Sequence, residues 1–196
     1  MSHYFHKRQS SPLDEQEFST SLLGQQLRFF TASGLFSKDH LDIATRLLIE
    51  SADLTGAKTA LDLGCGWGPV CVALGRLHSD ISFTAVDASL RALEYTRKNA
   101  LKNRVEVTVL EANVCQGLGM FDVILTNPPY AAGRETCYRF IEESFEHLTT
   151  GGSLQLVARH QKGGKMLEKK MNEVFGNVSV LGKKAGFRVY CSIREE

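Results

Sequence analysis

Short apolar segments alternate with helical segments through most of the chain, and this alternation restricts the fold more than any other feature. Segments rich in apolar or β-branched residues predict strands at 59–64, 81–87, 105–112, 121–127 and 153–159. Apolar residues at three-to-four spacing predict helices at 68–78, 89–103, 135–150 and 163–175, the third closing on Gly151 and Gly152. Such βαβ units imply a parallel sheet with helices on both faces. The sequence therefore predicts an α/β fold.

The chain closes differently from the units before it. Segments 177–182 and 187–193 resemble strands, and only "KKAG" separates them. A connection this short cannot hold a crossover helix, so the two strands should form an antiparallel hairpin.

The first 35 residues do not continue the alternation. We interpret 1–35 as an N-terminal extension that packs on one domain, 36–196. That domain should begin with a helix from His40, for which Ser37 or Asp39 is available as the N-cap.

Composition excludes several classes of protein. The 196 residues are 43% hydrophobic and 23% charged, which is typical of one globular domain. No apolar stretch approaches the roughly 20 residues of a membrane helix, and the first 20 residues lack an apolar signal core, so we expect a cytoplasmic protein without membrane contact. The five cysteines form no CxxC pair and the six histidines match no zinc spacing, so no metal is expected.

The net charge of +1 excludes a general nucleic-acid coat. Basic residues nevertheless gather at Lys7 and Arg8, in 97–104 and in 162–184, where they either form a solvated face or contact an acidic partner.

Glycines and polar residues follow the predicted strands. Gly64, Gly66 and Gly68 follow the first strand, where glycine allows a sharp turn and close approach to a ligand, although a plain strand-to-helix turn would use them too. Their GxGxG spacing does not match the GxGxxG pattern of dinucleotide sites. Asp87 ends the second strand and either accepts ribose hydroxyls or caps the next helix. Asn113 ends the third strand, beside an adenine edge or simply in a turn.

Residues 125–130, "LTNPPY", end the fourth strand abruptly. Two prolines remove two backbone donors, so neither a helix nor a central strand continues through them. The motif is either an ordinary turn or a site, because the carboxyl ends of parallel strands meet at one sheet edge. That edge would bring Asn127 close to Gly64 and Asp87.

Together, "LDLGCGWGP", Asp87 and "TNPPY" resemble a class I S-adenosylmethionine-dependent methyltransferase. "GLFSKDHLDIATRLL" and "VFGNVSVLGKKAGFRVY" are similar to the small methyltransferase domain family, which includes the ribosomal small-subunit RNA guanine-N2 methyltransferase C enzymes. The resemblance runs from about Phe36 to the C-terminus. It implies a Rossmann-like, seven-stranded, mostly parallel sheet whose last strand is inserted antiparallel.

The resemblance also implies a site for S-adenosylmethionine. The glycine-rich segment would surround the methionine end, Asp87 would hold the ribose, and Asn113, where many relatives have Asp, would lie beside the adenine. The cofactor-binding residues it implies are Asp62, Gly64, Cys65, Gly66, Gly68, Asp87, Ala88, Asn113 and Asn127.

An Asn or Asp followed by Pro-Pro and an aromatic is the family pattern of enzymes that methylate a planar nitrogen. Asn127 Oδ1 and the Pro128 carbonyl would accept the two hydrogens of that amine, and Tyr130 would stack on the substrate. Arg134 is a candidate for a substrate phosphate, or for a salt bridge at a helix end. Phe36 is a further candidate substrate contact.

The expected reaction is methyl transfer to the exocyclic N2 of a guanine in small-subunit ribosomal RNA, with that RNA or the subunit as partner. The nitrogen is indicated by the motif, whereas guanine and ribosome are implied by the resemblance alone. N5-methylation of a protein glutamine and N6-methylation of adenine in RNA or DNA remain alternatives. A binding module that keeps the fold without the chemistry is a further one.

Overall fold

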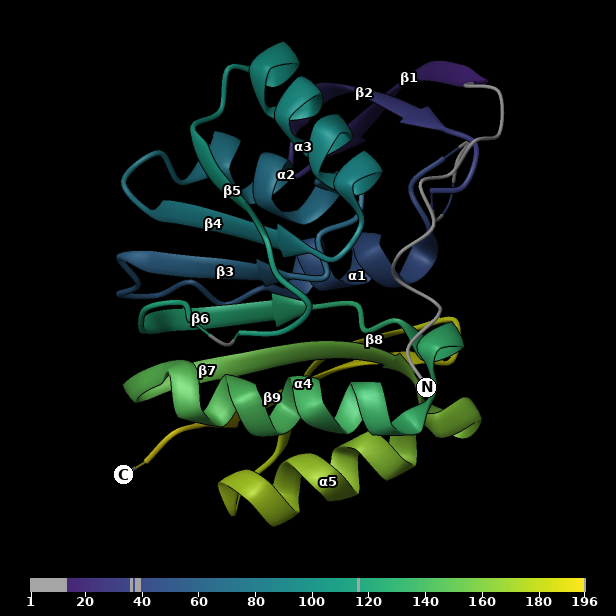
Figure 1. Cartoon of the computed structure of the whole chain (residues 1–196). Coiled ribbons are helices and arrows are strands. Elements are labelled where there is room, and N and C mark those ends of the chain that lie inside the picture. The colour runs from purple at the N-terminus through teal and green to yellow at the C-terminus, as the bar shows by residue number, and fades with distance from the viewer. Residues whose placement is uncertain (1–13, 36, 38–39, 116, 196) are drawn as a thin grey trace.

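The computed structural model describes residues 14–35, 37, 40–115 and 117–195. A twisted sheet of seven strands, in the order β5-β4-β3-β6-β7-β9-β8, forms its centre (Figure 1). A separate antiparallel pair, β1 and β2, precedes it. The strands are β1 (Glu15–Leu22), β2 (Gln25–Ala32), β3 (Thr59–Leu63), β4 (Ser82–Asp87), β5 (Val107–Glu111), β6 (Phe121–Thr126), β7 (Leu148–Arg159), β8 (Ser179–Lys184) and β9 (Phe187–Ile193).

The sheet has the predicted topology. The neighbours from β5 to β7 pair in parallel, whereas β9 lies antiparallel between β7 and β8. The Rossmann-like α/β class, the closing hairpin and the inserted last strand are therefore confirmed.

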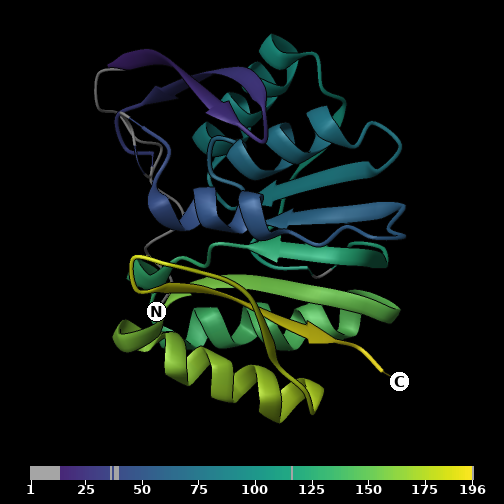
Figure 2. The same ribbon diagram turned by 180° about the vertical axis from the view of Figure 1, so that it is seen from behind.

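Helices cover both faces of the sheet because strand side chains alternate in direction. Ala60 and Leu125 belong to the core beneath α1, α2 and α3, whereas Leu61 and Ile124 belong to the core beneath α4 and α5. Figure 1 shows α4 and α5 on the near face, and Figure 2 shows α1 on the opposite one. The helices are α1 (Ile43–Ser51), α2 (Pro69–Leu77), α3 (Leu90–Asn103), α4 (Arg134–His147) and α5 (Lys165–Phe175), with a 3-10 turn at Tyr130–Ala132 and a π-helical segment at His160–Gly164.

Two predicted details are wrong. The N-cap of α1 is Asp42, whose Oδ1 accepts the N–H groups of Ala44 and Thr45; Ser37 lies earlier, and Asp39 lies outside the described residues. Helix α4 ends before Leu148, and Gly151 and Gly152 lie inside β7 instead of stopping the helix. There the strand pairing, with its shift in register against β6, takes precedence over the helical spacing of the sequence.

The β1–β2 hairpin was not predicted, and it packs on α3. Asn99 Oδ1 accepts the N–H of Phe30 at 2.7 Å, and Asn99 Nδ2 donates to the carbonyl of Phe30 at 2.9 Å. One turn along α3, Asn103 makes the same pair of bonds to Arg28, at 3.0 and 2.7 Å. The two amides therefore satisfy an edge of β2 as a neighbouring strand would.

The hairpin also neutralises part of the basic stretch 97–104. Lys98 Nζ lies 2.6 Å from Glu15 and Lys102 Nζ lies 3.4 Å from Glu17, and both ammonium groups approach the Phe30 ring. These two lysines therefore hold the hairpin in place. Lys7 and Arg8, also predicted as a basic group, lie outside the described residues.

Candidate active site

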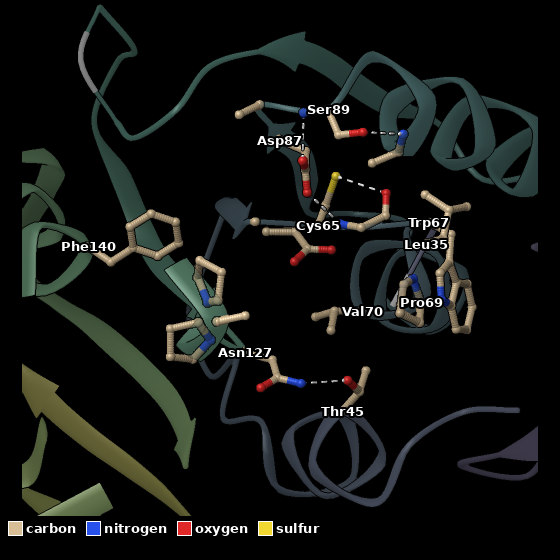
Figure 3. Close-up of a pocket in the computed structure, with 18 of the residues that line it drawn as sticks. Leu35, Thr45, Cys65, Trp67, Pro69, Val70, Asp87, Ser89, Asn127 and Phe140 are labelled. Carbon is tan, nitrogen blue, oxygen red and sulfur yellow. Dashed lines mark hydrogen bonds between the residues drawn. The ribbon is translucent and has the colours of Figure 1, made fainter. Parts of the chain in front are cut away.

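A cavity of about 680 Å³ opens at the carboxyl ends of β3, β4 and β6, where ligands of parallel sheets bind (Figure 3). Ten of the predicted site residues line the cavity. Gly68, the N-cap of α2, and Arg134 do not line it. Phe36 falls outside the described residues. The ten are Asp62, Gly64, Cys65, Gly66, Asp87, Ala88, Asn113, Asn127, Pro128 and Tyr130.

The glycine turn is fastened to the end of β4. The N–H groups of Gly64 and Cys65 both donate to the carbonyl of Val86 at 2.9 Å. Gly64 and Gly66 have positive φ angles of 74° and 58°, which glycine adopts without a steric penalty. A side chain on Gly68 would approach Thr96 to 2.9 Å, so this glycine allows close packing against α3.

Asp87 faces the cavity with both oxygens already hydrogen-bonded. Oδ2 accepts the N–H of Gly66 at 3.0 Å and Oδ1 accepts that of Ser89 at 2.8 Å. Ser89, rather than Asp87, caps α3. Burial raises the pKa of the Asp87 carboxyl, although these N–H groups oppose the rise. Each oxygen retains a lone pair that a hydroxyl donor in the cavity can use.

Asp62 is a buried carboxyl at the floor of the cavity, 2% exposed. Its Oδ2 accepts the N–H of Cys71 at 3.0 Å. Burial raises the pKa of Asp62 to about 7, and the nearby Asp87 adds to the rise. A positively charged ligand group placed here would favour the charged carboxylate again.

Asn127 lies at the end of β6 and points toward α1. Its Nδ2 donates to Thr45 Oγ1 at 3.0 Å, as Figure 3 shows, which leaves Oδ1 as the acceptor that no described side chain occupies. Thr45 is buried and also lines the cavity. Thr45 was not predicted as a site residue, although it lies within the family-like segment 34–48, because its contact with Asn127 forms only in the folded chain.

The rest of the motif forms a tight turn. The Pro128 carbonyl accepts the N–H of Tyr130 at 2.9 Å, so one of its two lone pairs is engaged. The Tyr130 ring lies at the rim, 41% exposed, and its hydroxyl donates to the Val157 carbonyl at 3.4 Å. Arg134 begins α4 as an exposed residue and makes no ion pair within the described part of the chain.

The cavity can take a ligand with a cationic group and hydroxyl donors, because two carboxyls lie within a largely apolar wall. Asp62 offers a buried carboxyl, Asp87 a second one at the rim, and apolar side chains supply most of the wall. Trp67 and Phe140, which were not predicted, contribute to that wall. Within the described residues, no group of His, Cys, Asp and Glu could hold a metal ion, and no helix is long and apolar enough to cross a membrane.

Comparisons with known proteins show the family of this chain. The family model described as "Methyltransferase small domain" matches residues 26–191. An uncharacterized protein of Bacillus subtilis, YbxB, is 32% identical over 95% of this chain and 96% of its own length. The ribosomal RNA small subunit methyltransferase C of Escherichia coli is 32% identical over 97% of this chain, which spans 56% of that protein.

Among solved structures, the 16S rRNA guanine N2 methyltransferase RsmC of T. thermophilus, determined with AdoMet and guanosine, superposes with a TM-score of 0.82 at 27% identity. It covers 94% of this chain, and the chain corresponds to 51% of it. The chain thus spans about half the length of the methyltransferase C relatives. By family, fold and cavity, the chain belongs to the methyltransferase small domain family and is an S-adenosylmethionine-dependent methyltransferase.

Proposed function

We propose that this protein methylates the exocyclic N2 of a guanine in small-subunit ribosomal RNA. The observation that carries the proposal is the Asn127 amide, which Thr45 holds with Oδ1 free beside Pro128 and Tyr130. Relatives named ribosomal RNA small subunit methyltransferase C support RNA as the substrate, and the RsmC structure with guanosine supports guanine as the base.

The cofactor supplies a methyl group on a positively charged sulfur. Asp62 would pair with the amino group at its methionine end, which fits a carboxyl whose pKa burial has raised to about 7. Asp87 would accept the ribose hydroxyls with its remaining lone pairs, and Asn113 would lie beside the adenine. The glycine turn would allow the backbone to approach the ligand closely.

The exocyclic amine of guanine is a poor nucleophile because its lone pair is shared with the ring. Asn127 Oδ1 and the free lone pair of the Pro128 carbonyl would accept its two hydrogens and draw the nitrogen toward a tetrahedral geometry. With the cofactor bound, the nitrogen would form its bond to the methyl carbon as the carbon–sulfur bond breaks and its electron pair stays on sulfur, and the methylated nitrogen would then lose a proton to water. A neutral amide suffices for this sequence, because the amine loses its proton only after the transfer.

Positioning should supply the larger share of catalysis. Each acceptor contributes about 1 to 3 kcal/mol, and stacking on Tyr130 a further ~1 to 3 kcal/mol. In-line placement of nitrogen and methyl can contribute on the order of 7 to 11 kcal/mol. The rigid turn at Pro128 serves that placement.

The substrate test uses the whole chain with a radiolabelled methyl donor. Small ribosomal subunits, naked small-subunit RNA, DNA and a protein with exposed glutamines would be offered separately. We expect label in RNA, recovered as N2-methylguanosine after digestion to nucleosides. Label only in the protein would support N5-methylation of glutamine instead, and label in adenine would support an N6 enzyme.

The same modification should depend on the gene in cells. Nucleoside analysis of small-subunit RNA from cells with and without the protein should show the loss of one N2-methylguanosine. If small-subunit RNA from cells lacking the protein still contained every N2-methylguanosine, the proposed substrate would be ruled out.

A further inference from the structure

A second hollow, of about 370 Å³, lies where the β8–β9 turn meets the π-helical segment after β7. Both views place the turn of the yellow hairpin at the sheet edge toward which the arrows of β3, β4 and β6 point (Figures 1 and 2). The hollow therefore shares the edge of the sheet on which the cavity opens. We call it the basic hollow, and its lining includes His160, Lys183, Lys184, Phe187 and Arg188.

Two cations of the basic hollow lie opposite each other, and none of the described residues provides a counter-charge to them. Lys183 on β8 is the direct cross-strand partner of Arg188 on β9, so both side chains leave the same face of the hairpin. In the part of the chain that the structure describes, no carboxylate lies within 4.0 Å of either group. Their neighbour Lys184, by contrast, lies 3.6 Å from Glu50. Directly opposed like charges destabilise a hairpin, and a bound anion would offset this repulsion.

His160 forms another wall of the basic hollow. His160 Nδ1 lies 2.7 Å from the Tyr190 hydroxyl and 3.8 Å from the Glu168 carboxylate, and the His160 side chain is 12% exposed. Burial lowers the pKa of His160, and Arg188 and Lys183 lower it further against the opposing Glu168 carboxylate. Glu168 approaches His160 and Glu50 approaches Lys184, so Lys183 and Arg188 are the cations of the basic hollow that no carboxylate of the described residues neutralises.

The basic hollow is joined to the proposed substrate position by one short segment. The N–H of His160 donates to the Gly186 carbonyl at 2.9 Å, which fixes the segment to the hairpin turn. On the same segment, a side chain placed at Gly163 would come within 3.9 Å of Tyr130 Cε1. The segment 160–164 thus contacts the hairpin turn at its start and lies close to Tyr130 near its end.

We propose that the basic hollow binds a backbone phosphate of single-stranded RNA adjacent to the base that is methylated, an inference that rests on the proposed function. A groove that combines cations for the backbone with an aromatic ring for the base is the usual arrangement for a single strand. The other large basic stretch offers less, because Lys98 and Lys102 are paired with the β1–β2 hairpin.

The test measures RNA binding and turnover of the full-length double variant Lys183→Gln/Arg188→Gln. The ligand is a short single-stranded RNA containing one guanine, and its dissociation constant is measured over a range of salt concentrations. We expect affinity to fall about tenfold and the slope of log Kd against log salt to fall by about 1. The KM for RNA should rise, while the dissociation constant of S-adenosylmethionine stays unchanged and reports correct folding.

The matched control is Lys58→Gln/Lys169→Gln, which also removes two positive charges but at sites away from the basic hollow. Lys169 is an exposed residue of α5 beside Glu173, and Lys58 precedes β3 at the opposite sheet edge. We expect this variant to bind RNA as the wild type does. Equal losses in the two double variants would assign the effect to net charge and overturn the phosphate site.

The outcomes separate the two proposals. RNA methylation that is unaffected by Lys183→Gln/Arg188→Gln would reject the basic hollow and leave the proposed function standing. If the wild type methylates only protein, the proposed function fails, and the RNA binding titration still decides whether the basic hollow takes a phosphate. Binding of an acidic peptide there, with no change in RNA affinity on mutation, would make it a protein contact instead.

Discussion

The chemistry proposed for Asn127 depends on which atom of its amide faces the cavity. Oδ1 can accept a hydrogen from the substrate amine, whereas Nδ2 would repel it. In the structure Nδ2 donates to Thr45 Oγ1, which leaves Oδ1 available to the substrate, and Asp42 in turn fixes the first turn of the helix that carries Thr45. A residue of α1 thus orients one that follows β6.

Replacing Asn127 by Ala tests the role of the amide directly. Turnover should fall at least about a hundredfold, since one preorganised polar group is lost, while cofactor affinity stays nearly unchanged. Steady-state kinetics and calorimetric titration of S-adenosylmethionine measure the two quantities. Asn127→Asp, which keeps an acceptor, should retain more activity. Equal losses of turnover and cofactor affinity in the Ala variant would show that Asn127 belongs to the cofactor site alone.

Thr45→Val should lower kcat about tenfold or more by freeing the Asn127 amide to rotate, because the valine keeps the shape but removes the acceptor. Thr45→Ser keeps the hydroxyl and serves as the control, with kcat close to wild type. Because the effect acts on orientation, KM for the substrate should change less than kcat. Similar kcat values for the Val and Ser variants would refute the positioning role.

Because the pKa of Asp62 is raised, we expect the cofactor-free protein to become less stable as pH rises. Its pKa in the folded protein, about 7, exceeds the ordinary value of 3.8, so the fold favours the protonated form. Protonated Asp62 contributes its full stabilisation to the cofactor-free protein below pH 3.8. As pH rises from 3.8 to 7 the free energy of unfolding therefore decreases by on the order of 4 kcal/mol. Asp62→Asn should flatten this decline in urea unfolding measured from pH 5 to 8. An unchanged pH profile in the variant would contradict it.

Cofactor affinity should also depend on the Asp62 carboxyl, but it should increase as pH rises, whereas stability decreases. Only ionised Asp62 attracts the amino group, so wild-type affinity should weaken as pH falls below 7, by at most about tenfold per unit. Asp62→Asn should bind weakly at every pH, as titration calorimetry would show.

At the scale of elements, sequence periodicity was sufficient to predict the strands and helices that belong to the βαβ pattern. The seven sheet strands and five main helices were predicted, because alternation and three-to-four spacing are local properties. The β1–β2 hairpin was missed because β1 reads as polar, with only Phe18 and Leu22 as large apolar residues, and it depends on distant amides in α3. The part of the site formed by α1 was missed for the same reason: Thr45 meets Asn127 only in the folded chain.

Although Asn99 is polar, we expect its side chain to make a large contribution to the stability of the β1–β2 hairpin. Its side chain is fully buried and bonds to both backbone groups of Phe30 and to the Trp67 carbonyl. Asn99→Ala leaves these groups unsatisfied and should lower the free energy of unfolding by about 2 to 4 kcal/mol. Leu101→Ala, at an exposed position of the same helix, should change it by less than about 0.5 kcal/mol.

Urea unfolding gives these free energies, and hydrogen exchange at the Phe30 amide reports the hairpin itself. Faster exchange there in Asn99→Ala, with the central sheet still protected, is the expected pattern. A stability loss spread evenly over the sheet would show that Asn99 holds the core rather than the hairpin.

At the scale of the molecule, the cavity lies where two halves of the sheet meet. Asp62 and Asp87 come from β3 and β4 and Asn127 follows β6, so a bound cofactor would contact the ends of three neighbouring strands at once. At a hundredfold excess over Kd, a ligand specific for the folded state stabilises it by about 2.7 kcal/mol. For a chain of this length that corresponds to a rise of roughly 5 to 10 °C in Tm.

Thermal unfolding with and without S-adenosylmethionine should show this rise in the wild type and most of it in Asn127→Ala. Asp87→Ala should lose most of it at the same cofactor concentration, because the ribose hydroxyls lose their acceptor while the glycine turn loses the bond at Gly66. Lys183→Gln/Arg188→Gln should retain it in full, since the basic hollow lies beyond Tyr130. An Asp87→Ala variant stabilised as strongly as the wild type would place the ribose elsewhere and would require a different orientation of the cofactor across the sheet.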